Sequence, residues 1–388
     1  MNQSLRDRTD IAILGMGTAL PVHEVAQSDI AELIASSLED QQDLARFAKR
    51  VFRSCGVETR YTVEPSYLGP LEDCRYLPSG SGDHSLIPST QERMDTYKRE
   101  AVPLGMEAAQ KALKDAGMSP EQITHIITVS CTGQYLPGLD VMLIRDLGLS
   151  PRVNRLPLIF QGCAAGLKAI QMARDVVQGM ADAQVLVVCV ELCTLHFQPV
   201  KERGALFAAS FFGDGASACI VAAPESEQRH YLDLGTGYSV LLPDSTEDMT
   251  WEVGNQGYDL YLSPRIPKLL GAHLENELYQ LLGSDSLPEL WAIHPGGRGI
   301  VDSVQEVMNL RAEQTKYSRE ILRTVGNLSS NTILFVLQAM REELKARNQS
   351  STEGVAMAFG PGLTAELMRF TYVPSYTPAL KEKDHVLL

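Results

Sequence analysis

The feature that most constrains the fold of this chain is a regular alternation of apolar, strand-like runs with helical segments. Strands are expected at residues 11–14, 125–129, 185–190, 218–222, 232–242, 290–294, 355–359 and 367–373. Helical spacing occupies residues 27–54, 94–115, 167–177 and 318–344. Strands that alternate with helices predict an α/β fold. The nearly continuous apolar run Val185–Val190 predicts a strand that is buried on both faces.

Polar residues recur at matching positions in the two halves of this pattern. Cys131 ends a strand-like run 32 residues before Cys163, and His294 ends another 33 residues before Asn327. Cys163 and Asn327 each follow a glycine at the start of a helix-like segment. An internal duplication would fold as two similar layers, with the loop ends of both halves meeting at one central site.

Cys163 is the strongest candidate for a nucleophile. It lies in the sequence Gly-Cys-Ala-Ala-Gly at 162–166, before a segment in which apolar residues recur at helical spacing from Leu167 to Val177. The small neighbours predict room for a substrate backbone, and the first turn of a helix stabilises a thiolate. A lone cysteine is more often a small buried apolar residue, so Cys163 needs partners elsewhere in the chain.

His294 and Asn327 are the expected partners. His294 is followed by Pro-Gly-Gly, which fixes the turn after its strand, and an imidazole can take a proton from a thiol near neutral pH. The amide of Asn327 can donate to a developing oxyanion without protonating an enolate. Taken singly, His294 is a satisfied turn histidine and Asn327 a helix N-cap. The matching register of the two halves favours a joint catalytic role.

Composition limits the partners of the chain. A net charge of -14 argues against nucleic acid and an anionic membrane surface as main partners. The seven cysteines form no Cys-x-x-Cys pair and no zinc-like spacing with histidine, so we expect reduced thiols and no metal. Residues 1–10 lack the apolar centre of a signal peptide, and no apolar run is long enough to span a membrane. We therefore expect a cytoplasmic protein.

Five motifs together resemble the type III polyketide synthases, the chalcone-synthase-like branch of the thiolase-fold condensing enzymes, and the bacterial members in particular. The motifs are Gly162–Gly166, Phe212–Gly215, Ile293–Gly297, Gly326–Ser330 and Gly360–Thr364. The resemblance covers nearly the whole chain. It implies a thiolase-like α/β fold with duplicated βαβαβαββ halves in a layered αβαβα arrangement. We expect the half with the nucleophile at residues 1–225 and the half with the histidine and asparagine at 226–388.

The resemblance implies a catalytic triad of Cys163, His294 and Asn327. An acyl starter would move from coenzyme A onto Cys163, malonyl-CoA units would be decarboxylated and condensed onto it, and the chain would cyclise to a pyrone, a resorcinol or a related ring. Phe212 corresponds to the family's gatekeeper, because an apolar wall beside a carboxylate favours loss of carbon dioxide. Taken alone, Phe212 is an ordinary core residue. The resemblance implies no cofactor, only coenzyme A thioesters as substrates.

The resemblance also places coenzyme A contacts on this chain. Lys49, Arg50 and Arg53 fall on the segment that carries cationic contacts in the family, and Arg50 and Arg53 can share one helix face. The match is partial, and a solvated charged face explains these residues equally well. Gly296 and Gly297 would let the pantetheine arm pass close to the backbone.

Two further features follow from the resemblance. Leu136, with Pro137, corresponds to the segment that completes the neighbour's cavity in a homodimer. Cavity positions that carry threonine in plant members are matched by Cys131, Cys193 and His196. Small thiols would open a pocket for an aliphatic starter, and His196 would narrow it or polarise an intermediate. Core packing explains the two cysteines equally well.

Three other functions remain for comparison. A ketoacyl-ACP synthase III-like initiating condensing enzyme would share the fold and the triad, but its histidine motif usually reads His-Gln-Ala-Asn. An α/β-hydrolase orders nucleophile, acid and then histidine, whereas here His294 follows Cys163 and Asn327 comes last. A scaffold that only binds acyl-CoA would lack a triad member.

Overall fold

The computed structural model describes residues 10–38, 40–77, 87–180, 182–198, 203–225, 227–283 and 287–375. Nine strands of these residues pair into one mixed sheet. Their order is β11 (Leu290–Ile293), β12 (Thr352–Gly360), β13 (Thr364–Ser375), β8 (Arg229–Leu241), β1 (Ala12–Ala19), β7 (Asp214–Ala222), β6 (Val185–Leu192), β4 (His125–Ser130) and β5 (Asn154–Ile159). Two smaller sheets pair β9 (Met249–Gly254) with β10 (Gly257–Leu262), and β2 (His23–Ala26) with β3 (Thr59–Thr62).

Eight strands of the large sheet form two arms with the same strand order. The first arm contains β4, β6, β7 and β1, and the second contains β11, β12, β13 and β8. The ninth strand, β5, extends the first arm at its outer edge, parallel to β4. In each arm the first two strands are parallel and the later pairs are antiparallel. The arms join where Ala12 pairs with Asp233 and Ile13 with Leu232. The expected duplicated α/β fold is confirmed.

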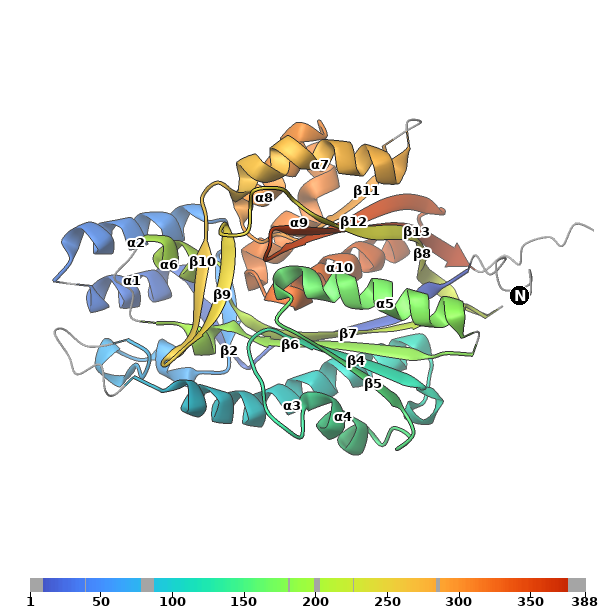
Figure 1. Cartoon of the computed structure of the whole chain (residues 1–388), viewed down its shortest axis with the longest axis horizontal. Coiled ribbons are helices and arrows are strands. Elements are labelled where there is room, and N and C mark those ends of the chain that lie inside the picture. The colour runs from blue at the N-terminus through green and yellow to red at the C-terminus, as the bar shows by residue number, and fades with distance from the viewer. Residues whose placement is uncertain are drawn as a thin grey trace, which may run out of the picture.

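Helices cover the outer faces of both arms and fill the space between them (Figure 1). The outer helices are α3 (Thr90–Ala116) and α4 (Leu139–Leu147) on the first arm, and α7 (Ile266–Leu282) and α8 (Arg298–Val307) on the second. Between the arms lie α5 (Ala165–Gly179) and α10 (Thr332–Ala346). The helix α9 (Ala312–Val325) packs beside the edge strand β11 and against α10. The layers therefore alternate helix, sheet, helix, sheet and helix.

The remaining elements gather at one end of the molecule. There the helices α1 (Gln27–Ser37), α2 (Gln42–Ser54) and α6 (Arg203–Ala209) lie beside the hairpin of β9 and β10, at the left of Figure 1. Short 3₁₀ helices are η2 (Pro65–Leu68), η3 (Leu71–Asp73), η5 (Pro120–Gln122), η6 (Gly162–Ala164), η7 (Cys193–His196) and η8 (Ser329–Asn331). Two of these, η6 and η7, carry residues of the predicted site, and η8 begins two residues after Asn327.

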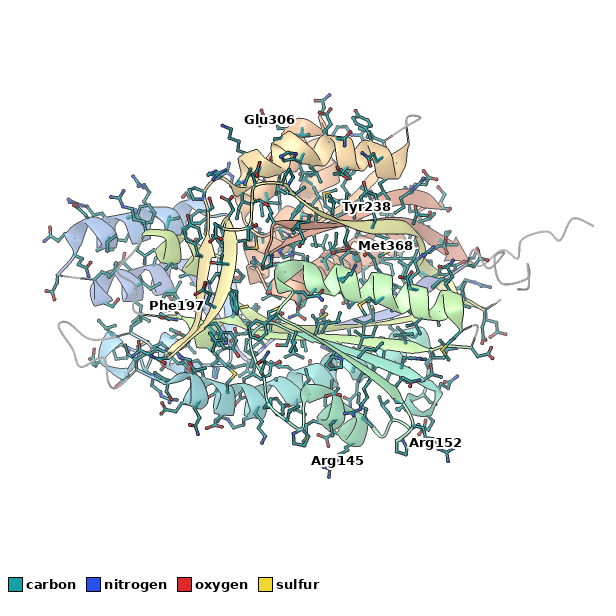
Figure 2. All side chains as sticks on the ribbon, viewed as in Figure 1. Arg145, Arg152, Phe197, Tyr238, Glu306 and Met368 are labelled. Carbon is teal, nitrogen blue, oxygen red and sulfur yellow. The ribbon has the colours of Figure 1, made fainter. Side chains whose placement is uncertain are left out.

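Side chains fill the spaces between the layers (Figure 2). Every residue of β4 and β6 is buried, because helices cover both faces of these strands, as the apolar run predicts. α3 begins earlier than its periodic segment predicts, because Ser89 and Glu92 form a reciprocal cap at its start. Gly117, in the left-handed region at φ 70°, ends this helix as a helix stop predicts.

The single helix predicted at residues 318–344 is wrong, because the chain breaks between α9 and α10. Gly326 adopts a φ of 78°, and a Cβ there would lie 2.6 Å from the carbonyl oxygen of Phe211. The chain then pairs with the first half. The backbone N–H of Asn327 donates to Phe211 O (2.8 Å), and the backbone carbonyl of Asn327 accepts from Gly213 N (3.0 Å). This break places Asn327 against the other half of the molecule.

Candidate active site

Cys163 lies in η6, directly before α5, so the expected position at the start of a helix is correct to within one turn. The small residues around it bring backbones together. A Cβ at Gly162 would lie 2.2 Å from Pro361 Cδ, and a Cβ at Gly166 would lie 2.0 Å from the carbonyl oxygen of Ser330. The space beside these glycines is filled by protein, so they do not provide the room for substrate that the sequence predicts.

Asn327 directs its amide toward the thiol of Cys163. Its Nδ2 donates to the carbonyl oxygen of Gly296 (3.1 Å) and lies 3.9 Å from Cys163 Sγ. Its Oδ1 accepts from Ser329 N (2.8 Å) and from the hydroxyl of Thr332 (3.2 Å). Because the oxygen is held on one side, the NH₂ group has to face the sulfur.

His294 lies at the end of β11, where its backbone N–H donates to Met357 O (2.8 Å). Its side chain is 1% exposed, and neither ring nitrogen has a hydrogen-bond partner among the described residues. Its Nε2 approaches Gly296, where an added Cβ would lie 3.4 Å away. Burial lowers the pKa of His294 to about 3, so the imidazole is neutral near pH 7 and can accept a proton.

Burial favours the protonated form of the Cys163 thiol. Burial raises its pKa to about 11, while hydrogen bonds with Ser329 and Asn327 act in the opposite direction. Burial therefore opposes the thiolate expected from the helix start. Attack on a substrate needs a base. His294 is neutral, has free ring nitrogens among the described residues, and lies beside Gly296, whose carbonyl oxygen accepts from Asn327 Nδ2.

Glu191, a buried carboxyl group near Cys163 that the sequence analysis missed, links the two halves of the chain by hydrogen bonds. Glu191 is fully buried and accepts from Cys131 N (3.0 Å), from the Thr132 hydroxyl (2.7 Å) and from the Ser330 hydroxyl (2.5 Å). Burial raises the pKa of Glu191. Its signal in the sequence is a carboxylate that follows the continuous apolar run Val185–Val190.

Cys131, predicted to line the cavity, supports the backbone beside the nucleophile. Its Sγ accepts from Gly162 N (3.0 Å). Burial raises the pKa of Cys131 well above its usual range. Cys131 therefore holds the turn that carries Cys163.

A cavity of about 580 Å³ opens beside the predicted gatekeeper. Phe212, Cys193 and His196 line it, as the resemblance implies, together with residues of α1, α6 and the hairpin of β9 and β10. Phe212 also pairs with Asn327 in an isolated β-bridge, so it joins the cavity to the site of Cys163.

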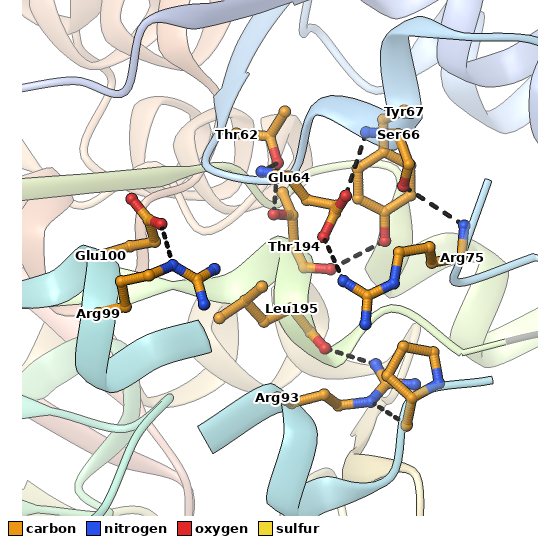
Figure 3. A network of polar contacts seen from close by, with 11 residues as sticks. Thr62, Glu64, Ser66, Tyr67, Arg75, Arg93, Arg99, Glu100, Thr194 and Leu195 are labelled. Atoms are coloured by element: carbon orange, nitrogen blue, oxygen red, sulfur yellow. Dashed lines mark hydrogen bonds and ion pairs between the residues drawn. The ribbon is translucent and has the colours of Figure 1, made fainter. Parts of the chain in front are cut away.

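A polar network holds η7 at the edge of this cavity, and Figure 3 shows it from close by. The hydroxyl of Tyr67 donates to Thr194 O (2.9 Å), and the hydroxyls of Thr62 and Thr194 lie 2.7 Å apart. Buried Arg93 donates to the carbonyl oxygen of Leu195. The positions of Cys193 and His196 are therefore fixed before any substrate enters.

His196 cannot polarise an intermediate, contrary to one expectation. Its Nε2 lies 2.6 Å from the carbonyl oxygen of Thr132 and must carry the proton, and its Nδ1 accepts from Tyr258 N (3.0 Å). Its ring stacks on that of Tyr258, with centroids 4.1 Å apart. Burial lowers the pKa of His196 to about 3. This histidine is a neutral support that holds β10 against the loop after β4.

The cationic residues that are predicted to contact coenzyme A lie on α2, a helix at one end of the molecule (Figure 1). Lys49 Nζ pairs with Glu32 at 2.6 Å, and the Arg50 guanidinium lies 5.4 Å from the ring centroid of Phe47. Arg53 is in the last turn of α2. Two of the three cations therefore already have a contact within the protein.

The end of α2 lies next to the glycine pair after His294. Shortly after Arg53, a Cβ at Gly56 would lie 3.5 Å from the Cβ of Arg298, the residue that follows Gly297. Arg298 forms an exposed pair with Asp302 at 3.3 Å. The sequence analysis missed this cation, although it directly follows the glycine pair. The end of α2, which carries the predicted cations, therefore lies close to Gly296 and Gly297, the predicted contacts of the pantetheine arm.

Leu136 lies away from this site. It is 92% exposed and borders a second hollow of about 800 Å³ along the outer strand β5. Among the described residues, no group of three or more acidic, histidine or cysteine side chains could hold a metal ion. None of the described helices is both long and apolar enough to cross a bilayer.

The duplicated layers, with a thiol, an imidazole and a carboxamide in adjoining segments, define a condensing enzyme of thiolase-like fold. The chain belongs to the chalcone and stilbene synthase family. The family model "Chalcone and stilbene synthases, N-terminal domain" matches residues 1–225, and the model of the C-terminal domain matches residues 233–374. The protein is therefore a type III polyketide synthase, an acyltransferase of the condensing kind.

Solved structures of type III polyketide synthases are similar over almost the whole chain. The C-terminal type III polyketide synthase domain of Steely1, a type I/III hybrid from Dictyostelium, is 26% identical with a TM-score of 0.85. That match covers 94% of this chain and 99% of that domain. PKS-I from the brown alga Ectocarpus siliculosus is 25% identical with a TM-score of 0.84, and the match covers 95% and 100% of the two chains.

Proposed function

We propose that this enzyme loads an acyl-CoA starter on Cys163, extends it with malonyl-CoA by repeated decarboxylative condensation, and cyclises the chain. The observation that carries this proposal is the amide of Asn327. The Oδ1 atom of this side chain accepts from Ser329 N, and the Nδ2 atom lies 3.9 Å from the sulfur of Cys163. The oxygen of Asn327 also caps the turn that follows it, since it accepts from Ser329 N, but the contact of Nδ2 with the thiol is more than a cap requires.

The loading step transfers the starter from one sulfur to another. The Cys163 sulfur attacks the thioester carbonyl while its proton moves to the neutral imidazole of His294. A new carbon–sulfur bond forms, the bond to coenzyme A breaks, and the departing sulfur takes the proton back. The raised pKa of Cys163 supports proton transfer during attack, because a free thiolate is costly in this buried site.

The extension step needs stabilisation of an enolate. Malonyl-CoA loses carbon dioxide, and negative charge grows on its thioester oxygen, where Asn327 Nδ2 and His294 can donate hydrogen bonds. The enolate carbon attacks the acyl group on Cys163, a carbon–carbon bond forms, and the cysteine sulfur leaves. Phe212 places an apolar ring beside this region, which disfavours the carboxylate before it is lost. No step requires a metal or a redox cofactor.

The cavity supports an aliphatic starter. The part of its wall formed by α1, α6 and β10 includes the apolar residues Ile30, Ala205, Ala208 and Leu260. Cys193 adds a thiol whose pKa burial raises well above its usual range, so it is an uncharged lining group. An acyl chain that leaves water for this surface gains about 0.8 kcal/mol for each buried methylene.

Coenzyme A would lie on the surface between the end of α2 and the pair Gly296 and Gly297. Lys49, Arg50 and Arg53 would face its phosphates, and Gly296 and Gly297 would face its pantetheine arm. The closeness of Gly56 to Arg298 supports this assignment, because it joins the two predicted segments and adds a fourth cation. A net charge of -14 makes such a local cluster of cations necessary for an anionic substrate.

We also propose a cytoplasmic homodimer. The side chain of Leu136 is almost fully exposed beside the hollow at β5, which an interface would cover. A mass in solution near twice the 42.6 kDa of one chain is the expected result. All seven cysteines are unpaired, which fits a reducing compartment.

The test combines decanoyl-CoA and malonyl-CoA with no carrier protein. The protein should gain the mass of a decanoyl group, release carbon dioxide and form decanoyl-primed polyketides, all detectable by mass spectrometry. Cys163→Ala should abolish the acyl-enzyme, whereas Cys193→Ala, which removes a neighbouring thiol, should still form it. His294→Gln and Asn327→Ala should reduce extension about a hundredfold or more while the proteins remain folded. Carbon dioxide release that requires malonyl on a carrier protein would instead indicate the initiating ketosynthase.

A further inference from the structure

The hairpin of β9 and β10 comes from the second half of the chain but closes the cavity against the first half (Figure 1). Its tip is fixed to the start of α3, because Thr90 N donates to Asn255 O (2.9 Å) and Gly257 N donates to the Thr90 hydroxyl (2.8 Å). His196 holds β10 through Tyr258 N. The hairpin is therefore a fixed wall whose inward side chains meet whatever fills the cavity.

Most polar side chains deep in the opposite wall already have partners within the protein. Arg60 donates to Gln27 Oε1 and to backbone carbonyls that include Phe212 O (2.7 Å). The hydroxyls of Thr194 and Tyr67 donate to Asp214 (2.6 Å) and Thr194 O (2.9 Å). Both ring nitrogens of His196 are occupied, as described above. These groups shape the cavity but have little to offer a ligand.

Trp251, on β9, is different. It lines the cavity, and its Nε1 is buried without a hydrogen-bond partner among the described residues. Its ring stands edge-on to those of His196 and Tyr258, with both centroids 6.1 Å away. An indole N–H can only donate, and buried ones normally have an acceptor. The other tryptophan of the chain obeys this rule, because Trp291 Nε1 donates to Pro288 O (2.7 Å).

The position of Trp251 links it to the end of the cavity near the nucleophile. Cys193 and His196 are three residues apart on the 3₁₀ helix η7, so they lie on the same edge of it. Cys193, Phe212 and the partly buried Cys163 pack in one apolar cluster. A chain attached to Cys163 that enters the cavity past Phe212 and Cys193 therefore runs toward the indole.

We propose that Trp251 Nε1 donates a hydrogen bond to a ketone oxygen of the growing polyketide and so determines how far the chain is extended. This inference depends on the proposed function. An alkyl starter carries no acceptor along its chain, but every condensation with malonyl-CoA adds one ketone. A ketone oxygen only accepts hydrogen bonds, so it matches the donor that the indole leaves open. Trp251 thus stabilises extended chains over the bare acyl group.

The test measures binding without turnover. In the Cys163→Ala background, decanoyl-CoA is compared with 3-oxodecanoyl-CoA and 5-oxodecanoyl-CoA by isothermal titration calorimetry. These ligands share the nucleotide and the chain length and differ only in the ketone. We expect at least one oxo ligand to bind about three- to tenfold more tightly than decanoyl-CoA, as for one net hydrogen bond. Adding Trp251→Phe, which keeps an aromatic ring but removes the N–H, should abolish this preference.

A spectroscopic readout tests the contact directly. With ¹⁵N-labelled tryptophan the chain gives two indole N–H resonances, because it contains two tryptophans. The resonance lost in Trp251→Phe should shift when the preferred oxo ligand binds and stay nearly unchanged with decanoyl-CoA, while that of Trp291 should not respond. No preference for either oxo ligand, or the same preference after Trp251→Phe, would overturn the inference.

Failure of the inference is distinct from failure of the proposed function. If the unmodified enzyme makes no carbon dioxide from malonyl-CoA, the proposed function fails whatever the indole does. If it makes polyketides, Trp251→Phe in the intact enzyme should shift the products toward fewer extensions. An unchanged product distribution would count against the role of Trp251 alone.

Discussion

Replacing Gly166 by alanine should separate the catalytic groups with only a modest loss of stability. Gly166 lies in the first turn of α5, one turn after the nucleophile, where α5 meets η8 of the other half. A Cβ at this position would lie 2.0 Å from the carbonyl oxygen of Ser330 and 3.3 Å from Leu334 Cδ1. The nearer atom belongs to the backbone, so no side chain can rotate away to make room.

The size of the effect follows from this contact. Because real Cβ atoms do not approach oxygen closer than 3.0 Å, α5 and η8 must move apart by at least 1 Å. Cys163 moves with one segment and Asn327 with the other, so their separation of 3.9 Å has to increase. A displacement of about 1 Å from the productive geometry costs about a hundredfold in rate. Overpacking at such a contact costs about 1–3 kcal/mol in the free energy of unfolding.

The assay is polyketide formation from decanoyl-CoA and malonyl-CoA, together with urea denaturation of both proteins. Gly179→Ala is the matched control, because Gly179 ends the same helix and a Cβ there would meet nothing within 4 Å. It should keep full activity and gain a few tenths of a kcal/mol in stability, since alanine favours helix. If Gly166→Ala keeps its activity within about threefold, the backbone contact between the halves does not position the site.

Two further predictions concern charge and cavity size. Burial, with the charge of Asp10, raises the pKa of Asp233 to about 6, so its contribution to stability is present below about pH 4 and lost as the pH rises through about 6. Asp233→Asn should therefore raise the free energy of unfolding near pH 8 by about 1 kcal/mol, because solvent screens a side chain that is only partly buried, and change it little near pH 3.5; urea titrations that show equal effects at both would contradict this. Cys193→Phe should shift the preferred acyl-CoA toward shorter chains, since its ring would fill part of the cavity, and an unchanged length profile would remove Cys193 from the starter pocket.

The sequence predicted the fold well because the fold depends on patterns within single segments. The apolar run Val185–Val190 became β6, and Gly117 ended α3 as expected. The duplication was visible because two motifs recur at nearly equal spacing. The long helix at residues 318–344 was wrong, because its break depends on Gly326 meeting the backbone of Phe211, a residue more than a hundred positions away. The division of the chain at residues 1–225 and 226–388 stays a prediction.

The site was predictable only in part for a similar reason. Motifs suggested Cys163, His294 and Asn327, whose roles stay a proposal for experiment. The importance of Glu191 arises from three partners on two segments far from it in the sequence, which no local pattern reveals. The polarising role expected for His196 failed because both its nitrogens are occupied by backbone groups that only the fold brings near.

The hairpin of β9 and β10 has a consequence for how such enzymes diversify. It lies outside the segments that carry the thiol, the imidazole and the carboxamide, yet it supplies much of one side of the chamber where the product takes shape. Its anchoring at Thr90 and His196 involves mainly backbone groups of the hairpin, which any sequence there can provide. Substitutions in this hairpin can therefore change the shape of the chamber one residue at a time while the thiol, the imidazole and the carboxamide stay in place. Exchanging the hairpin between homologues is a direct route to new ring systems.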